Sequence, residues 1–127
     1  MSNTIYTIEK IKDIVKPIAN KYNVQSIYLF GSYARGDANE NSDLDFLVFG
    51  GDNFKLTNIF ALAEDLRIAF QRQVDVFEIS EINTDSDFYL TIMNERLYVA
   101  WNTPTSNVFK KFLNMLKNFY PISVKMI

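Results

Sequence analysis

The sequence predicts one domain of the α+β (mixed α/β) class, in which a small mixed β-sheet carries helices mainly on one face. Two observations favour this class. The chain has 127 residues with 48% hydrophobic content, which is enough for one globular domain with a buried core. Helical and strand patterns follow each other in the order α-β-β-α-β-α-β-α, and the first two strands are joined by a loop. A parallel crossover is therefore available only between the second and third strands.

The first elements can be placed from apolar spacing and turn residues. Residues 7–22 are expected to form a helix, because apolar side chains recur there every three to four positions. Thr7 is a suitable N-cap, whereas Pro17 should kink the helix or mark a boundary. A short apolar strand is expected over residues 25–30, followed by a polar loop at 35–43.

The middle of the chain continues with alternating strands and helices. The strand predictions rest on short runs rich in apolar and β-branched residues, and the helix predictions on amphipathic spacing. In order, we expect a strand at 43–50, a helix at 56–70, a strand at 73–80, a short helix at 86–97 and a strand at 97–101.

The chain changes character after residue 101. Residues 102–127 contain four lysines and no acidic residue, and an apolar stripe over 108–120 predicts one last helix. We therefore expect residues 1–101 to form the main domain and residues 102–127 to form a C-terminal amphipathic, basic tail. This tail either packs on the same domain or presents its apolar side to a partner.

Composition excludes several kinds of chemistry. The sequence has no cysteine and no histidine, which excludes disulfides, thiolate metal sites and histidine-based acid–base chemistry. The net charge of −2 provides no overall basic field, so direct nucleic-acid binding is not expected. No apolar run approaches the ~20 residues of a membrane span, and the N-terminus lacks the apolar region of a secretory signal. We expect no membrane association and a cytoplasmic location.

Two aspartates open the strand at 43–50 and are the first candidates for catalysis. Asp43 and Asp45 point to one face of that strand, because side chains alternate along a strand. Two carboxylates so close together repel each other unless a cation neutralises them. Oxygen ligands alone favour Mg²⁺ or Mn²⁺ over zinc.

A third carboxylate, Asp75, lies in the strand at 73–80. If this strand is the neighbour of the strand at 43–50, Asp75 comes beside Asp43 and Asp45. Three carboxylates on two adjacent strands are typical of a two-metal phosphoryl-transfer site. We therefore take all three as candidate catalytic and metal-binding residues, with Asp75 also able to accept the proton of the nucleophile.

Gly31 and Ser32 follow the strand at 25–30 and are candidate nucleotide-binding residues. A glycine allows the backbone to approach a phosphate closely, and the serine hydroxyl and nearby N–H groups can donate to phosphate oxygens. A helix starting near Tyr33 would add positive potential. Arg35 is a third candidate, either as a phosphate ligand or as an anchor of the loop through a carboxylate such as Asp37.

The spacing of these residues carries a family resemblance. Gly31-Ser32, ten residues, and then Asp43-x-Asp45 resemble the signature of the DNA polymerase β-like nucleotidyltransferase superfamily. Together with the strand around Asp75, the stretch is similar to the minimal nucleotidyltransferase (MNT) antitoxins of HEPN–MNT toxin–antitoxin pairs. The resemblance covers roughly residues 5–101 and does not reach the tail.

The resemblance implies both an activity and a partner. It implies transfer of AMP from MgATP to a tyrosine of a cognate HEPN-family ribonuclease toxin, which is thereby neutralised in a hetero-oligomeric pair. It implies two Mg²⁺ ions, with Mn²⁺ as a substitute, and ATP as substrate. By motif, Gly31 and Ser32 would take the triphosphate, Asp43 and Asp45 the metals, and Asp75 the third-carboxylate role. The HEPN motif needs a histidine, so this chain is not the toxin.

Two alternatives remain open from the sequence. One is an antitoxin that acts by binding alone, although three converging carboxylates bring no advantage to a simple binder. The other is a small-molecule nucleotidyltransferase, for which 127 residues leave little room for a substrate domain.

Several other polar residues are given ordinary roles. We expect Tyr33 to be a surface tyrosine and Glu78 to face solvent, because Glu78 has the opposite register from Asp75. Arg72 is expected to be a solvated residue at a helix surface. The acidic run Asp85–Asp87 is interpreted as the N-cap region of the next helix.

Overall fold

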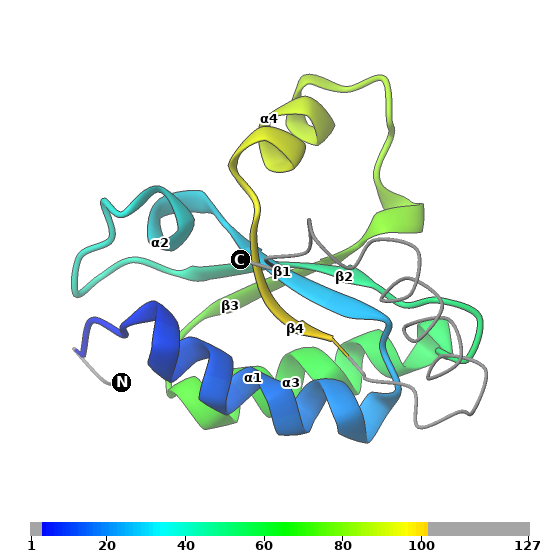
Figure 1. The fold of residues 1–127 in the computed structure, drawn as a ribbon, viewed down its shortest axis with the longest axis horizontal. Helices are drawn as coiled ribbons and strands as arrows, with labels where there is room; N and C mark the ends of the chain where they lie inside the picture. Colours follow the sequence, from blue (N-terminus) through cyan, green and yellow to red (C-terminus); the bar gives the residue numbers. More distant parts are fainter. Residues whose placement is uncertain (1–3, 102–127) are drawn as a thin grey trace, which may run out of the picture.

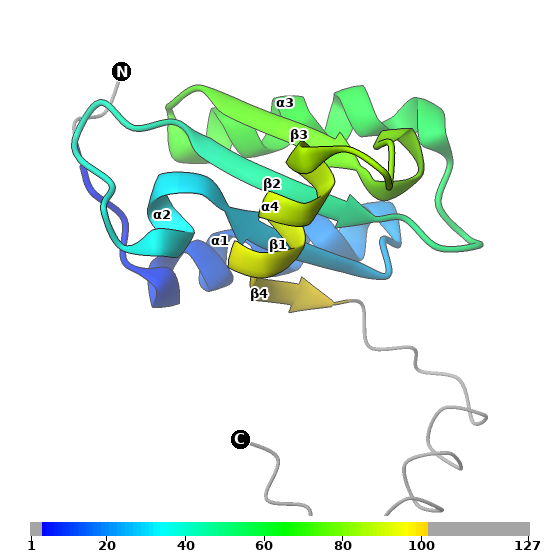
Figure 2. The ribbon, with the colours of Figure 1, turned by 90° about the horizontal axis from the view of Figure 1, so that it is seen from above.

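The computed structural model describes residues 4–101, so the tail predicted for 102–127 lies outside the described residues. Its centre is a four-stranded sheet with the strand order β3-β2-β1-β4. Two long helices, α1 (Ile8–Tyr22) and α3 (Ile59–Phe70), cover one face, and the shorter helix α4 (Asp87–Glu95) lies over the other (Figures 1 and 2). The predicted α+β class, with helices mainly on one face, is confirmed.

The strands form a mixed sheet, as predicted. They are β1 (Ser26–Phe30), β2 (Leu44–Phe49), β3 (Val74–Glu78) and β4 (Leu97–Trp101). Strand β1 is antiparallel to both β2 and β4, whereas β2 and β3 are parallel. The parallel pair is connected through α3, which is the one crossover that the element order allowed.

Short elements complete the described part of the chain. A five-residue helix, α2 (Gly31–Arg35), follows β1 directly, so the polar loop begins only after Arg35. The helix predicted at 56–70 starts as a 3₁₀ turn (Leu56–Asn58) before α3, and a second 3₁₀ turn (Ile79–Glu81) follows β3.

Helix α1 begins and ends by side-chain and backbone capping. The Thr7 hydroxyl oxygen accepts a hydrogen bond from the Lys10 N–H at 3.1 Å, and the helix ends at Asn23 in the left-handed conformation, with φ of 56°. Pro17 does not mark a boundary, because the helix continues to Tyr22. Both Pro17 and Asp13, whose carbonyl loses its helical donor, are exposed, so water can satisfy that carbonyl.

The alternation along β2 separates two apolar layers. Leu44, Phe46 and Val48 are fully buried in the larger core, which β2 shares with α1 and α3. Leu47 points the other way, into a smaller cluster with Ile92 of α4. Strand β2 is thus covered on both faces, which holds it rigidly where it carries Asp45.

Helix α4 begins as predicted from the acidic run before it. The Ser86 hydroxyl oxygen accepts a hydrogen bond from the Tyr89 N–H at 3.1 Å, and Asp87 lies in the first turn. Among the described residues, no helix has the length and apolar character needed to cross a membrane.

Candidate active site

The register of the sheet brings three of the candidate residues into a row. Phe30 at the end of β1 is the cross-strand partner of Asp45 in β2, and Asp45 is the partner of Asp75 in β3. Neighbouring strands lie about 4.8 Å apart. Gly31, which follows Phe30, therefore lies at one end of the row, Asp45 in its middle and Asp75 at its far end.

All six candidate site residues line a single hollow of about 480 Å³. Its lining comes from the end of β1, from α2, from the start of β2, from β3 and from α4. The lining residues are Gly31, Ser32, Arg35, Asp43, Asp45 and Asp75, together with Phe30, Phe77, Phe88 and Glu95.

Asp45 is the carboxylate whose charge is least favourable in this arrangement. Burial raises the pKa of Asp45, and the neighbouring carboxylates of Asp75 and then Asp43 raise it further, to about 6. The Arg35 charge acts in the opposite direction but is the smallest of these effects. The site therefore holds negative charge that a cation would relieve.

Glycine is favoured at position 31 mainly by the backbone conformation. Its φ of 74° lies in the left-handed region, which favours glycine. A Cβ at this position would also come too close to the Asp45 carboxylate unless that side chain turned away. The backbone at Gly31 and the Asp45 carboxylate therefore lie in close contact.

A divalent cation fits these donors chemically. Within residues 4–101, no three or more carboxylates are already grouped closely enough to hold a metal ion. The donor set consists of oxygen atoms only, as hard divalent cations prefer, and the repulsion at Asp45 is the kind that such a cation removes. The side chains of Asp43, Asp45 and Asp75 would have to turn toward one another to close a site around it.

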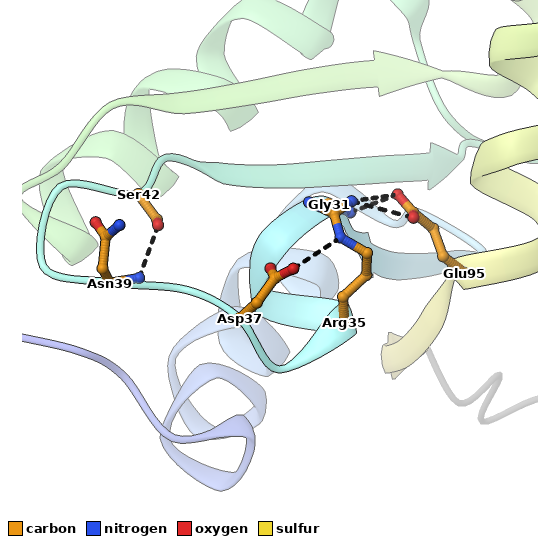
Figure 3. Close-up of polar contacts among 6 residues, drawn as sticks. All are labelled: Gly31, Arg35, Asp37, Asn39, Ser42 and Glu95. Atoms are coloured by element: carbon orange, nitrogen blue, oxygen red, sulfur yellow. Dashed lines mark hydrogen bonds and ion pairs between the residues drawn. The ribbon is translucent and has the colours of Figure 1, made fainter.

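The loop before β2 positions Asp43, which precedes the first strand residue and is exposed. The Asn39 N–H donates to the Ser42 hydroxyl oxygen at 2.8 Å (Figure 3). The Asn41 N–H donates to the Asn39 side-chain oxygen, also at 2.8 Å. These local bonds fix the turn that delivers Asp43 to the site.

Glu95 at the C-terminal end of α4 binds two of the candidate nucleotide-binding residues. The Gly31 N–H donates to Glu95 Oε1 at 2.9 Å, and Arg35 Nη1 donates to Glu95 Oε2 at 3.1 Å (Figure 3). Arg35 Nε also contacts Asp37 Oδ2 at 3.3 Å. The structure thus shows Arg35 as an anchor between two carboxylates. Sequence reasoning missed Glu95, because no local pattern indicates a contact across 64 residues.

Arg72 and Tyr33 are not surface residues, and both of those predictions were wrong. Each is only 4% exposed. Arg72 Nη1 donates to the Tyr33 hydroxyl and to the Ser42 carbonyl at 3.4 Å, and Nη2 donates to the Thr4 carbonyl at 2.5 Å. Helix α3 ends at Phe70, so Arg72 lies beyond the exposed face of that helix and reaches inward.

Glu78 is buried, with 5% exposure, so its predicted solvent position was also wrong. The opposite register from Asp75 was correct, but that face of β3 is the one packed against the helices. Glu78 caps the following 3₁₀ turn, where its side chain accepts from the Ser80 N–H at 2.8 Å. It also accepts from the Gly50 N–H at 3.4 Å.

Comparison with known proteins places this geometry in a family. The model of the polymerase beta nucleotidyltransferase family matches residues 9–100. The protein adenylyltransferase MntA of Thermococcus cleftensis is 33% identical over 97 residues, which cover 73% of this chain and 96% of that protein.

Two solved structures share the fold. A toxin–antitoxin structure with AMP-PNP matches with a TM-score of 0.61 at 24% identity, covering 87% of this chain and 90% of that one. A complex of tri-AMPylated Shewanella oneidensis HEPN toxin with MNT antitoxin matches with a TM-score of 0.57 at 20% identity, covering 91% of each chain. The chain therefore belongs to the polymerase beta nucleotidyltransferase family, with MntA protein adenylyltransferases among its relatives.

Proposed function

We propose that this chain is the antitoxin of a HEPN–MNT pair and transfers AMP from MgATP to a tyrosine of its cognate HEPN ribonuclease toxin, thereby neutralising it. The observation that carries the proposal is the row of Gly31, Asp45 and Asp75 across three adjacent strands, within one hollow. The MntA relative is named a protein adenylyltransferase, and the Shewanella complex contains an AMPylated HEPN toxin.

In this proposal, some residues of the hollow bind the metal ions and others bind the triphosphate. Asp43, Asp45 and Asp75 would hold two Mg²⁺ ions, for which Mn²⁺ could substitute, and these would neutralise the triphosphate and favour ionisation of the tyrosine hydroxyl. The Ser32 hydroxyl and the Gly31 N–H donate to phosphate oxygens, and the Gly31 N–H must then exchange or share its bond to Glu95. Arg35 supplies positive potential at the same end of the row.

The transfer step is an in-line displacement at the α-phosphorus. A bond forms between the tyrosine oxygen and the α-phosphorus, while the bond from that phosphorus to the bridging oxygen breaks and pyrophosphate leaves. The proton of the tyrosine passes to the Asp75 carboxylate, which lies at the far end of the row from Gly31.

The division of the chain at residue 101 and the cellular location belong to the same proposal. Residues 1–101 would form the catalytic domain, in keeping with the family match at 9–100, and 102–127 a tail that packs on it or on the toxin. The pair would act in the cytoplasm, where ATP and the RNA substrates of the toxin are found.

The test uses the purified chain, MgATP and the HEPN protein encoded beside it, with intact-mass spectrometry on both proteins. We expect the HEPN protein to gain the mass of one or more AMP units. The Asp43→Asn/Asp45→Asn double variant should give no gain, whereas Asp52→Asn, which changes an exposed aspartate outside the hollow, should behave like the parent chain. A stable complex without any mass gain would instead establish an antitoxin that acts by binding alone.

A further inference from the structure

The row across the sheet restricts the direction from which the acceptor can arrive. In-line displacement requires the nucleophile and the leaving group on opposite sides of the phosphorus. The triphosphate donors, Gly31 and Ser32, lie at the β1 end of the row, and Asp75 lies at the β3 end. With pyrophosphate leaving toward the β1 end, the tyrosine must enter from beyond Asp75.

Strand β3 is the outer strand of the sheet on that side, so among residues 4–101 no further strand covers its edge. A second hollow, of about 690 Å³, lies at this edge, between the C-terminal end of α3 and the start of β3. We call it the edge groove. Its walls include Arg67, Ile68, Gln71, Gln73, Val74 and Asp75. Asp75 is a lining residue of both the edge groove and the catalytic hollow, so the two hollows adjoin at this residue.

The chemistry of the edge groove suits a polypeptide segment. Ile68 offers an apolar side chain that is 64% exposed, and the side chains of Gln71 and Gln73 are exposed amides that can bond to a peptide backbone. The positive charges are already engaged: Arg67 forms an ion pair with Glu64, and the Arg72 guanidinium is buried against Tyr33 and Thr4. A nearly neutral segment is therefore favoured over a phosphate or a nucleic acid.

We infer that the edge groove is the docking site for the acceptor segment of the partner protein, with the tyrosine directed at Asp75 and a neighbouring apolar side chain packed on Ile68. The inference rests on the proposed function and names the surface through which its protein substrate is recognised. The nucleotide and the acceptor segment then bind at opposite ends of the row formed by Gly31, Asp45 and Asp75, so a substitution can weaken the binding of one without weakening that of the other.

The experiment compares two exposed apolar residues of the same helix. Ile68→Glu places a charge in the edge groove, whereas Phe60→Glu changes a side chain that is 82% exposed and lies outside it. AMP transfer is measured while the HEPN protein and ATP are titrated in turn. We expect Ile68→Glu to raise the KM for the HEPN protein by about tenfold or more, as loss of one central interface contact does. The KM for ATP and the melting temperature should stay unchanged, and Phe60→Glu should match the parent chain.

Ile68→Lys separates the loss of apolar contact from a charge effect, and it should raise the same KM by a similar factor. An unchanged KM for the HEPN protein in both Ile68 variants would overturn the inference. A shift in the KM for ATP would assign the groove to a nucleotide, and dissociation of a dimer of this chain, measured by light scattering, would assign it to a second copy. If the parent chain itself transfers no AMP, the proposed function fails, which distinguishes that outcome from failure of the groove alone.

Discussion

Asp45 sits where its negative charge is least favourable, between Asp43 and Asp75 and against the glycine backbone of Gly31. Its pKa is raised from 3.8 to about 6, so the folded state binds the proton more tightly than the unfolded state does. The contribution of Asp45 to the stability of the metal-free protein should therefore fall as the pH rises from about 4 to about 6, and return as the pH falls.

Asp45→Asn should stabilise the metal-free protein at pH 7.5, because it removes the buried charge and its repulsion. We expect a gain of about 1–2 kcal/mol, discounted for partial exposure, and a rise in melting temperature of a few degrees. Adding Mg²⁺ should raise the melting temperature of the parent chain more than that of the variant. Differential scanning fluorimetry with EDTA or Mg²⁺ measures both effects, and a variant less stable than the parent in EDTA would contradict the explanation.

At the scale of elements, α4 determines how α2 is held. Helix α2 has only five residues, of which Tyr33 is buried in the larger core, and both of its ends are bound by the Glu95 carboxylate through the Gly31 N–H and Arg35. Glu95 thereby couples the position of Gly31 and α2, the proposed phosphate-binding segment, to the packing of α4 on the sheet, where Ile92 is buried.

Glu95→Ala should loosen this loop. It leaves the Gly31 N–H without its acceptor and Arg35 with Asp37 alone, so we expect a KM for ATP several times higher and a loss of stability of about 1 kcal/mol. Glu95→Gln keeps an acceptor for Gly31 and should have an intermediate effect on the KM. Glu81→Ala, at an exposed site outside the hollow, is the matched control. A KM for ATP that falls in Glu95→Ala would mean that the carboxylate competes with the triphosphate instead of holding the loop.

The spacing of apolar and polar residues along the chain was enough to predict most helices and strands, and to predict that Asp45 and Asp75 lie close together if their strands pair. The alternation along β2 and β3 fixed the faces of Asp45 and Asp75, whereas the pairing of those strands was only a condition of the prediction, which the structure fulfils. The contacts of Glu95 and Arg72 could not be predicted in this way, because their partners are distant in the sequence. The partners of Glu95 lie 60 or more residues away, and those of Arg72 lie 30 to 68 residues away. Side chains at or just beyond helix ends leave the helical period, so their direction is decided by tertiary packing.

At the scale of the whole molecule, the sheet separates two tasks. Helices α1 and α3 lie on one face of the sheet and α4 on the other (Figure 2). The larger apolar core lies on the face of α1 and α3, and the hollow that holds the candidate site residues lies on the face of α4. Arg72 connects parts that are distant along the chain. Its guanidinium binds Thr4 in the N-terminal arm, Tyr33 in α2 and the Ser42 carbonyl beside Asp43. The positions of α2 and of the loop before β2, which carry the candidate residues Ser32 and Asp43, therefore depend on a cation buried between elements.

Arg72→Met should keep most of the side-chain volume while removing the charge and all of these hydrogen bonds. We expect a loss of about 2–4 kcal/mol in the free energy of unfolding, because the Tyr33 hydroxyl and two carbonyls lose a charged donor. Arg67→Met, which breaks an exposed ion pair with Glu64, should change it by less than about 0.5 kcal/mol. Urea unfolding measures both.

Below its melting temperature, the Arg72 variant should also transfer AMP more slowly at saturating ATP, since Ser32 and Asp43 adjoin the residues that Arg72 holds. Equal free energies of unfolding of Arg72→Met and Arg67→Met would show that the buried Arg72 does not hold α2 and the loop before β2 in place.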